Sequence, residues 1–137
     1  MKRTAVLALL LGLITTGLTT GYAQVPGSTE IIGSHYRDHT ERATIHYARG
    51  LRAKRKAEGE SDGEKRRKHY ERAKKELSKA VGFVANYDHL LALGQVYLAL
   101  GERVSAYDAC SRALALKPSD ASARECQETA QPEETRG

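Results

Sequence analysis

The sequence predicts an all-α fold for the part of the chain that follows an apolar N-terminal segment. Apolar residues recur at steps of three, four and seven over most of positions 34–130, which is the period of a helix that buries one face. Glycine, proline and helix-capping residues interrupt the pattern, and no stretch alternates as a half-buried strand would. With 137 residues, of which 40% are apolar, we expect one small folded domain.

Positions 1–23 have the pattern of a secretory signal peptide. Lys2 and Arg3 precede an apolar run, and small residues stand one and three places before a cut after Ala23. Cleavage there removes two basic and no acidic residues, which lowers the formal net charge from +5 to +3. We therefore predict a periplasmic or secreted protein. The alternative is an N-terminal membrane anchor, because the uncharged run from Thr4 onward has about the length that spans a bilayer.

A flexible lead-in is predicted over 24–34, where one proline and two glycines occur without a sustained period. The first helix is predicted over 34–58, with Ser34 as its N-cap and Tyr and Ala recurring on one face. Two glycines and a Ser-Asp pair end it and cap a second helix, predicted over 64–81. This second helix carries Lys and Arg outside its apolar face, and Gly82 is expected to end it.

The third helix is predicted to begin at Asn86 or Asp88 and to stop before a Gly-Glu turn. A fourth helix is predicted over 104–116, where a Lys-Pro pair stops it. The Ser-Asp pair that follows caps a short fifth helix over 121–130. Residues 131–137 are expected to form a disordered tail.

The third and fourth predicted helices carry the most specific pattern in the chain. Small and large apolar residues follow a fixed spacing over one 34-residue unit at 87–120. The signature positions are Leu90, Leu93, Gly94, Tyr97, Ala106, Cys110, Ala113 and Pro118. The segment resembles the tetratricopeptide repeat (TPR) family, although Leu90 and Cys110 stand where the family has aromatic residues. The resemblance implies two antiparallel helices that cross closely at the small residues.

An earlier segment, at about 43–86, resembles a degenerate copy of the same unit. Ala73, Leu77 and Ala80 repeat the spacing of the second helix, and Gly50 stands for the glycine of the first. The separation between Gly50 and Ala73 is longer by about 11 residues than in the clear repeat. We expect this insertion to lengthen the turn and the basic start of the second helix.

The resemblance implies a fold and a class of function. The fold is a short TPR-like α-solenoid of antiparallel helix pairs over 35–130, in which the helix at 121–130 is the polar cap that such arrays need. Weak self-association, a disulfide or a partner would supplement its small core. The expected function is that of a non-catalytic scaffold that binds a protein partner in a cell-envelope complex. Neither an enzyme nor a cofactor is expected, because the chain lacks a catalytic-triad context, a phosphate-binding loop and metal-ligand spacing.

The first helices of a TPR array form its concave face, which is where a partner is expected to bind. In the clear repeat this face would present Asp88, Leu91, Gln95, Leu98 and Ala99. A mixed apolar and amide surface suits an extended or helical segment of another protein. Family members that clamp a terminal carboxylate use Lys, Asn and Arg here, and this chain does not. The alternative for Leu91 and Leu98 is packing against a neighbouring helix.

Cys110 and Cys126 are the two cysteines of the chain. Export leads to an oxidising compartment, and adjacent antiparallel helices would bring the two side chains together. A disulfide is therefore one expectation, and a buried thiol at Cys110 is the other.

Histidines at positions 35, 39 and 46 fall at helical steps on one face of the first helix. A metal site built from His35, His39 and His46 is not expected, because Arg42 lies within the same stripe and would repel a cation. We expect a stripe that faces solvent or a partner.

Basic residues cluster at the start of the second helix, as Lys65, Arg66, Arg67 and Lys68. Such a run is usually a solvated helix face. The alternative function is an envelope-attached protein that binds the membrane surface, through anionic lipid, or a cell-wall polymer with this helix. Nucleic acid is not an expected partner, because the chain is exported and lacks interleaved aromatic residues.

Overall fold

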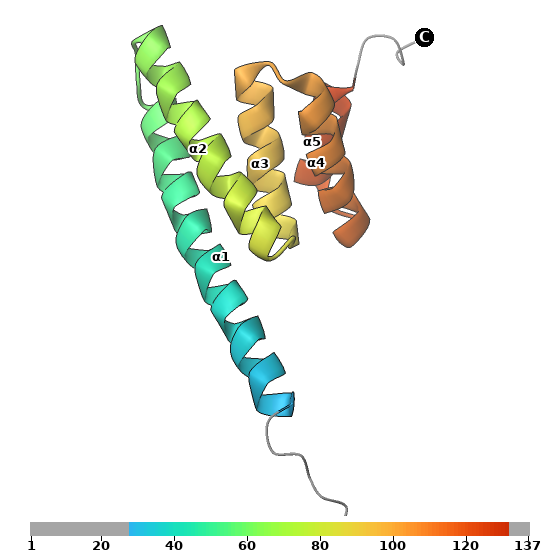
Figure 1. Ribbon diagram of the computed structural model, residues 1–137. Coiled ribbons are helices and arrows are strands. Elements are labelled where there is room, and N and C mark those ends of the chain that lie inside the picture. Colours follow the sequence, from blue (N-terminus) through green and yellow to red (C-terminus); the bar gives the residue numbers. More distant parts are fainter. Residues whose placement is uncertain (1–27, 132–137) are drawn as a thin grey trace, which may run out of the picture.

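Residues 28–131, which the computed structural model describes, form five α-helices and no strand (Figure 1). In chain order the helices are α1 (Ser28–Glu58), α2 (Gly63–Phe83), α3 (Tyr87–Leu100), α4 (Arg103–Leu116) and α5 (Ala121–Ala130). The all-α prediction is confirmed for these residues. The predicted signal peptide at 1–23, and positions 24–27 and 132–137, lie outside the described residues. None of the five helices combines the length and the apolar character that crossing a bilayer requires.

Helices α1 to α4 lie side by side in chain order, α5 overlaps α4 in this view, and successive helices run antiparallel (Figure 1). Each packs mainly against the next one along the chain, and α3 also contacts both α1 and α5. The first hairpin consists of α1 and α2, and the second of α3 and α4. The central helix α3 therefore joins the two hairpins and supports α5.

Side chains cap three of the helices where the sequence predicts a start. Asp62 accepts hydrogen bonds from two backbone N–H groups in the first turn of α2, at 2.9 and 3.0 Å. Asn86 and Asp120 each accept one at 2.9 Å, at the starts of α3 and α5. Gly101 ends α3 with a φ of 78°, a left-handed conformation that glycine adopts without steric cost. The connections between successive helices are short, with two to four residues each.

Two predicted helix boundaries are wrong. The first helix begins at Ser28, so positions 28–34 of the predicted lead-in are helical and Ser34 lies inside the helix. These positions contain no proline, and one glycine costs only about 1 kcal/mol, which a long helix tolerates. Gly82 does not end α2, which continues to Phe83 because the ring of Phe83 packs against two histidines of α1.

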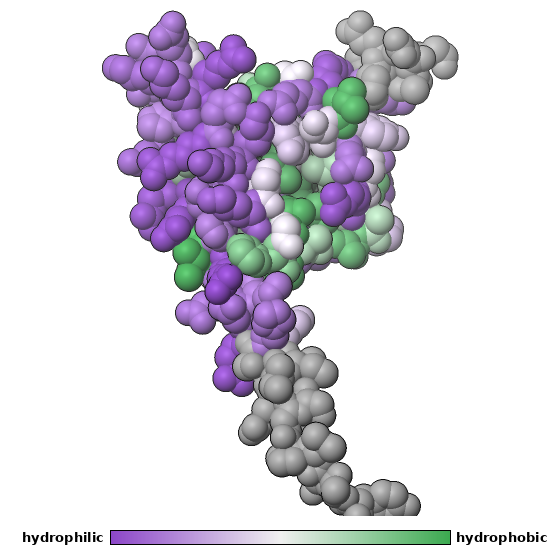
Figure 2. Space-filling model, viewed as in Figure 1, coloured by the Kyte–Doolittle hydropathy of each residue, from purple (hydrophilic) through white to green (hydrophobic). Residues whose placement is uncertain are grey.

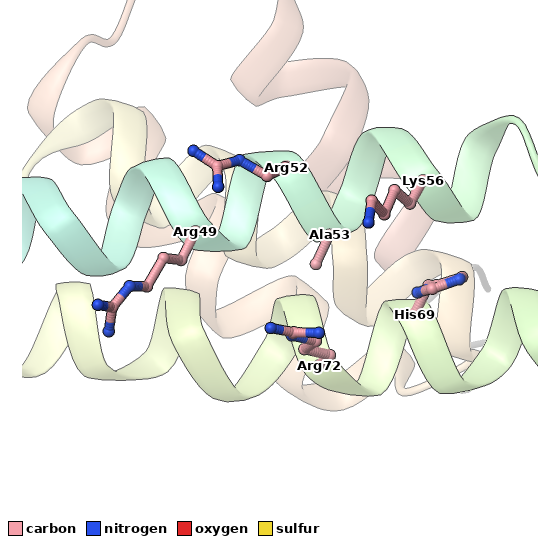
Figure 3. Close-up of a pocket in the computed structure, with 6 residues that line it drawn as sticks. All are labelled: Arg49, Arg52, Ala53, Lys56, His69 and Arg72. Carbon is pink, nitrogen blue, oxygen red and sulfur yellow. The ribbon is translucent and has the colours of Figure 1, made fainter.

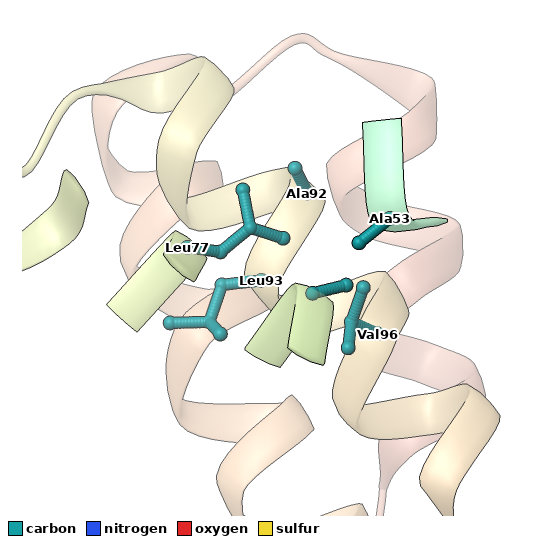
Figure 4. Packing of buried hydrophobic residues seen from close by; sticks show 6 residues of the cluster. Ala53, Leu77, Ala92, Leu93 and Val96 are labelled. Atoms are coloured by element: carbon teal, nitrogen blue, oxygen red, sulfur yellow. The ribbon is translucent and has the colours of Figure 1, made fainter. Parts of the chain in front are cut away.

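The core of the first hairpin consists largely of small residues that let the helices approach closely. One buried cluster joins α1, α2 and α3 (Figure 4). Its members are Ala53, Ala73, Leu77, Ala92, Leu93 and Val96. Three tyrosines, at positions 47, 70 and 97, pack around it and cover the alanines that would otherwise leave gaps.

A second buried cluster joins α3, α4 and α5 through Leu90, Ala113 and Ala123. A disulfide between Cys110 and Cys126 connects α4 to α5, with the two Cα atoms 5.7 Å apart. Of the two expectations for the cysteines, the structure therefore contains the bridge, and Cys110 is also fully buried.

Two glycines mark the close approach of the helices within each hairpin. A Cβ placed on Gly50 would lie 2.6 Å from Cγ of Leu77, and a Cβ placed on Gly94 would collide with Sγ of Cys110. Leu77 and Cys110 are both fully buried, as are the alanines four positions before and three positions after each of them. Both hairpins thus contain the same contact, between a glycine of the first helix and a buried residue of the second.

The first hairpin is longer than the second, which accounts for the inserted residues. Helix α1 continues eight residues past Gly50, and α2 begins ten residues before Ala73. The connection at 59–62 has only four residues. In the second hairpin α3 continues six residues past Gly94 and α4 begins three residues before Ala106, so most of the insertion lies at the start of α2, as expected.

Replacing Gly94 by alanine is expected to lower the free energy of unfolding by about 1–3 kcal/mol, although alanine favours helix more than glycine does. The added Cβ meets Sγ of Cys110, which the disulfide holds in place, and lies 3.2 Å from Sγ of Cys126. Urea denaturation followed by circular dichroism measures the change. Gly82→Ala is the matched control, because an added Cβ there has no neighbour within 4 Å. We expect it to raise stability by up to about 1 kcal/mol, and equal effects of the two variants would contradict the close approach.

Candidate functional site

A groove of ≈ 340 Å³ lies between α3 and α5. Gln95 and Leu98 line it from α3, and Ser122, Glu125, Cys126 and Thr129 line it from α5. Because Cys126 is bonded to α4, the α5 wall is covalently held to the second hairpin. The groove offers an apolar side chain, an amide, two hydroxyls and a carboxylate, so it can both pack against and hydrogen-bond a bound segment.

The structure brings two of the five predicted partner-binding residues, Gln95 and Leu98, into this groove. Leu91 is half-buried and packs against the cluster that joins α3, α4 and α5. Ala99 is exposed and lines a different hollow, beside the start of α2, and Asp88 is exposed at the first turn of α3. The predicted face divides in this way because α3 has a neighbour on each side, α5 on one and the first hairpin on the other.

A hydrogen bond between Tyr87 and Asp120 joins the starts of the two helices that form the groove. The hydroxyl of Tyr87 donates to Oδ1 of Asp120 at 2.5 Å, and this bond raises the pKa of Tyr87 to about 12. The same bond lowers the pKa of Asp120, which also caps α5. The pair therefore fixes how α5 enters beside α3.

The histidine stripe of α1 packs partly against α2, instead of facing solvent or a partner throughout. The rings of His39 and His46 lie 5.6 and 5.7 Å from the ring of Phe83. Nδ1 of His46 lies 2.8 Å from Oε2 of Glu76, and this hydrogen bond lowers the pKa of Glu76. His35 lies beside His39, with ring centroids 4.9 Å apart. Among the side chains that the structure describes, at positions 35–131, no group of three or more His, Cys, Asp or Glu could hold a metal ion.

The surface over α1 and α2 is strongly hydrophilic (Figure 2), and the sequence of these two helices is rich in Lys and Arg. The predicted patch, Lys65 to Lys68, is exposed throughout, but Arg66 and Arg67 line a hollow against the end of α3. A different set of cations lines a cavity beside α1 and α2 (Figure 3). That set consists of Arg49, Arg52, Lys56, His69 and Arg72. The sequence shows that the region is basic, but this arrangement depends on how the two helices face each other.

The described residues thus present two separate surfaces. The groove between α3 and α5 has mixed apolar and polar walls, and the cavity between α1 and α2 has cationic walls. The two share no lining residue. No protein-family model, no curated protein and no solved structure matches the chain.

Proposed function

We propose that the chain is an exported, non-catalytic scaffold of the tetratricopeptide type that binds a partner protein of a cell-envelope complex. The groove between α3 and α5 is the observation that carries the proposal. Its two walls are the first helices of successive units, the surface on which such arrays bind their partners. The N-terminal signal pattern supports export. Export would bring the groove into contact with proteins of the envelope.

Two equivalent hairpins support the assignment to this repeat class. Gly50 lies against Leu77 as Gly94 lies against Cys110. The first helices also contact one another in order, α1 with α3 and α3 with α5. Within residues 28–131, α1 makes no contact with α4 or α5, so these helices do not close into a bundle. In a solenoid, each repeat unit contacts only the units next to it.

The chemistry of the groove favours a short protein segment as its occupant. Leu98 provides an apolar contact, and Gln95, Ser122 and Thr129 provide hydrogen-bonding groups for a peptide backbone. Glu125 adds a carboxylate to the lining of the groove, which favours a segment without acidic residues beside it. A bound segment would therefore place an apolar side chain against Leu98.

A photo-reactive amino acid at Gln95 tests the proposal in cells that produce the protein. We expect one discrete protein adduct from Gln95 and none from the control position Ser105, which is exposed on α4. Leu98→Glu is expected to abolish the adduct, because it places a charge where the partner buries an apolar side chain. An adduct of equal yield from Ser105, or one that persists in Leu98→Glu, would contradict binding in the groove.

A further inference from the structure

The cavity between α1 and α2 is a cationic site outside the proposed peptide groove. Its volume is ≈ 150 Å³. A single water needs only about 10–15 Å³, so a ligand of several atoms fits. The lining residues are Arg49, Arg52, Ala53, Lys56, His69 and Arg72 (Figure 3). Ala53 is 4% exposed and forms an apolar base, and the lining cations Arg49, Arg52, Lys56 and Arg72 are exposed.

Helical spacing explains why these side chains line one cavity. Arg49, Arg52 and Lys56 lie three and four positions apart on one face of α1, and His69 and Arg72 lie three apart on α2. Figure 3 shows the guanidinium of Arg49 reaching toward α2 and that of Arg72 lying over α2, whereas that of Arg52 extends on the side of α1 away from α2. Along α1 the site extends from Arg49 to Lys56, which are seven positions apart, or about 10 Å at 1.5 Å per residue. The site is therefore elongated along the helices.

The cations of this cavity form no close ion pair within the described part of the chain. None of its four Arg and Lys side chains takes part in an ion pair there, whereas the neighbouring Lys54 pairs with Glu58 at 2.8 Å. Glu76 interacts electrostatically with Arg49, but its carboxylate is hydrogen-bonded to His46 at 2.8 Å. Like charges held together repel one another, and a bound anion would relieve this repulsion.

We propose that this cavity binds a ligand that carries a diphosphate group. Guanidinium groups pair with phosphate oxygens in a bidentate way, and a lysine ammonium adds a point charge. A single phosphate would contact the cations at one end of the elongated site, whereas two linked phosphoryl groups reach further along the helices toward the cations at the other end. Diphosphate occurs in soluble compounds and in lipid headgroups, and the site recognises the chemistry that the two sources share.

Isothermal titration calorimetry of the purified full chain with inorganic diphosphate tests the proposal. We expect diphosphate to bind at least about tenfold more tightly than orthophosphate, because more charged hydrogen bonds form. Arg49→Gln/Arg72→Gln is expected to weaken diphosphate binding by at least about tenfold. The matched control Arg66→Gln/Arg67→Gln removes the same charge from a different hollow and should change the Kd by less than about twofold.

Two outcomes would overturn the proposal. Equal losses in the two double variants would mean that diphosphate responds to the overall charge of the surface and not to this cavity. If diphosphate binds no more tightly than orthophosphate, the second phosphoryl group makes no additional contact in the site. Thermal unfolding by circular dichroism checks that the variants fold, and the exposed Lys56→Gln is a second variant expected to weaken binding if the double variant unfolds.

Vesicles distinguish the two sources of the diphosphate group. The probe is phosphatidylcholine vesicles that contain diacylglycerol diphosphate. Cosedimentation that is lost in Arg49→Gln/Arg72→Gln would indicate a lipid ligand, and calorimetric binding without cosedimentation would indicate a soluble one. Duplex DNA that binds more tightly than diphosphate, with equal losses in both double variants, would overturn the proposal in favour of a general polyanion surface.

Discussion

Reduction of the disulfide between Cys110 and Cys126 is expected to lower the free energy of unfolding by about 3 kcal/mol. The two cysteines are 16 positions apart in the sequence. In the chain-entropy model, a bridge across a loop of this size restricts the unfolded chain by about that amount. Because the effect lies in the unfolded state, the urea m-value should also rise on reduction, since the opened chain exposes more surface. Urea denaturation with and without a reductant measures both quantities.

The matched control for the disulfide is Cys110→Ala/Cys126→Ala, whose unfolding should not respond to the reductant. The groove provides a second readout, because Cys126 lines it. Reduction releases α5 from α4, so the photo-adduct from Gln95 should fall in yield, while diphosphate binding between α1 and α2 should not change. Stability that is the same with and without reductant would show that the bridge adds nothing to the fold.

Local signals in the sequence account for much of the fold. The bounds of α5 are those predicted, because Asp120 caps its start and accepts the N–H of Ala123 at 2.9 Å. Gly94 was expected at a close helix crossing, and a Cβ there would indeed meet Cys110. These features depend on residues that are near in sequence, or on the regular spacing of the repeat signature at 87–120. Periodicity and capping residues are sufficient to predict them.

Contacts between distant residues explain what the sequence could not predict. The hydrogen bond of His46 with Glu76 and the packing of Phe83 against α1 depend on the register of the first hairpin. That register follows from where the long α1 ends and α2 begins, and helix ends are the least certain part of a periodic pattern. The cationic cavity depends on the same register, because Arg49 and Arg72 are 23 positions apart. The sequence therefore shows a basic region without showing a site.

Replacement of Leu77 by alanine is expected to lower the free energy of unfolding by about 2–5 kcal/mol. Leu77 is fully buried in the cluster that joins α1, α2 and α3, so the substitution removes apolar contacts and leaves a cavity. Thermal and urea unfolding measure the loss. Leu116→Ala is the matched control, because Leu116 is 53% exposed, and it should change stability by less than about 0.5 kcal/mol. Similar losses in the two variants would mean that Leu77 is not a core residue.

The contact between Leu77 and Gly50 can be measured by a double-mutant cycle. Gly50→Ala alone is expected to cost about 1–3 kcal/mol, because steric overpacking outweighs the gain in helix propensity. The added Cβ would lie 2.6 Å from Cγ and 2.8 Å from Cδ2 of Leu77. Leu77→Ala removes both atoms, so Gly50→Ala should then fill part of the cavity and recover about 1 kcal/mol. Additive losses would contradict the contact. In the second hairpin the equivalent cycle would replace Cys110 and so remove the disulfide. The glycine contact can therefore be measured by itself only in the first hairpin.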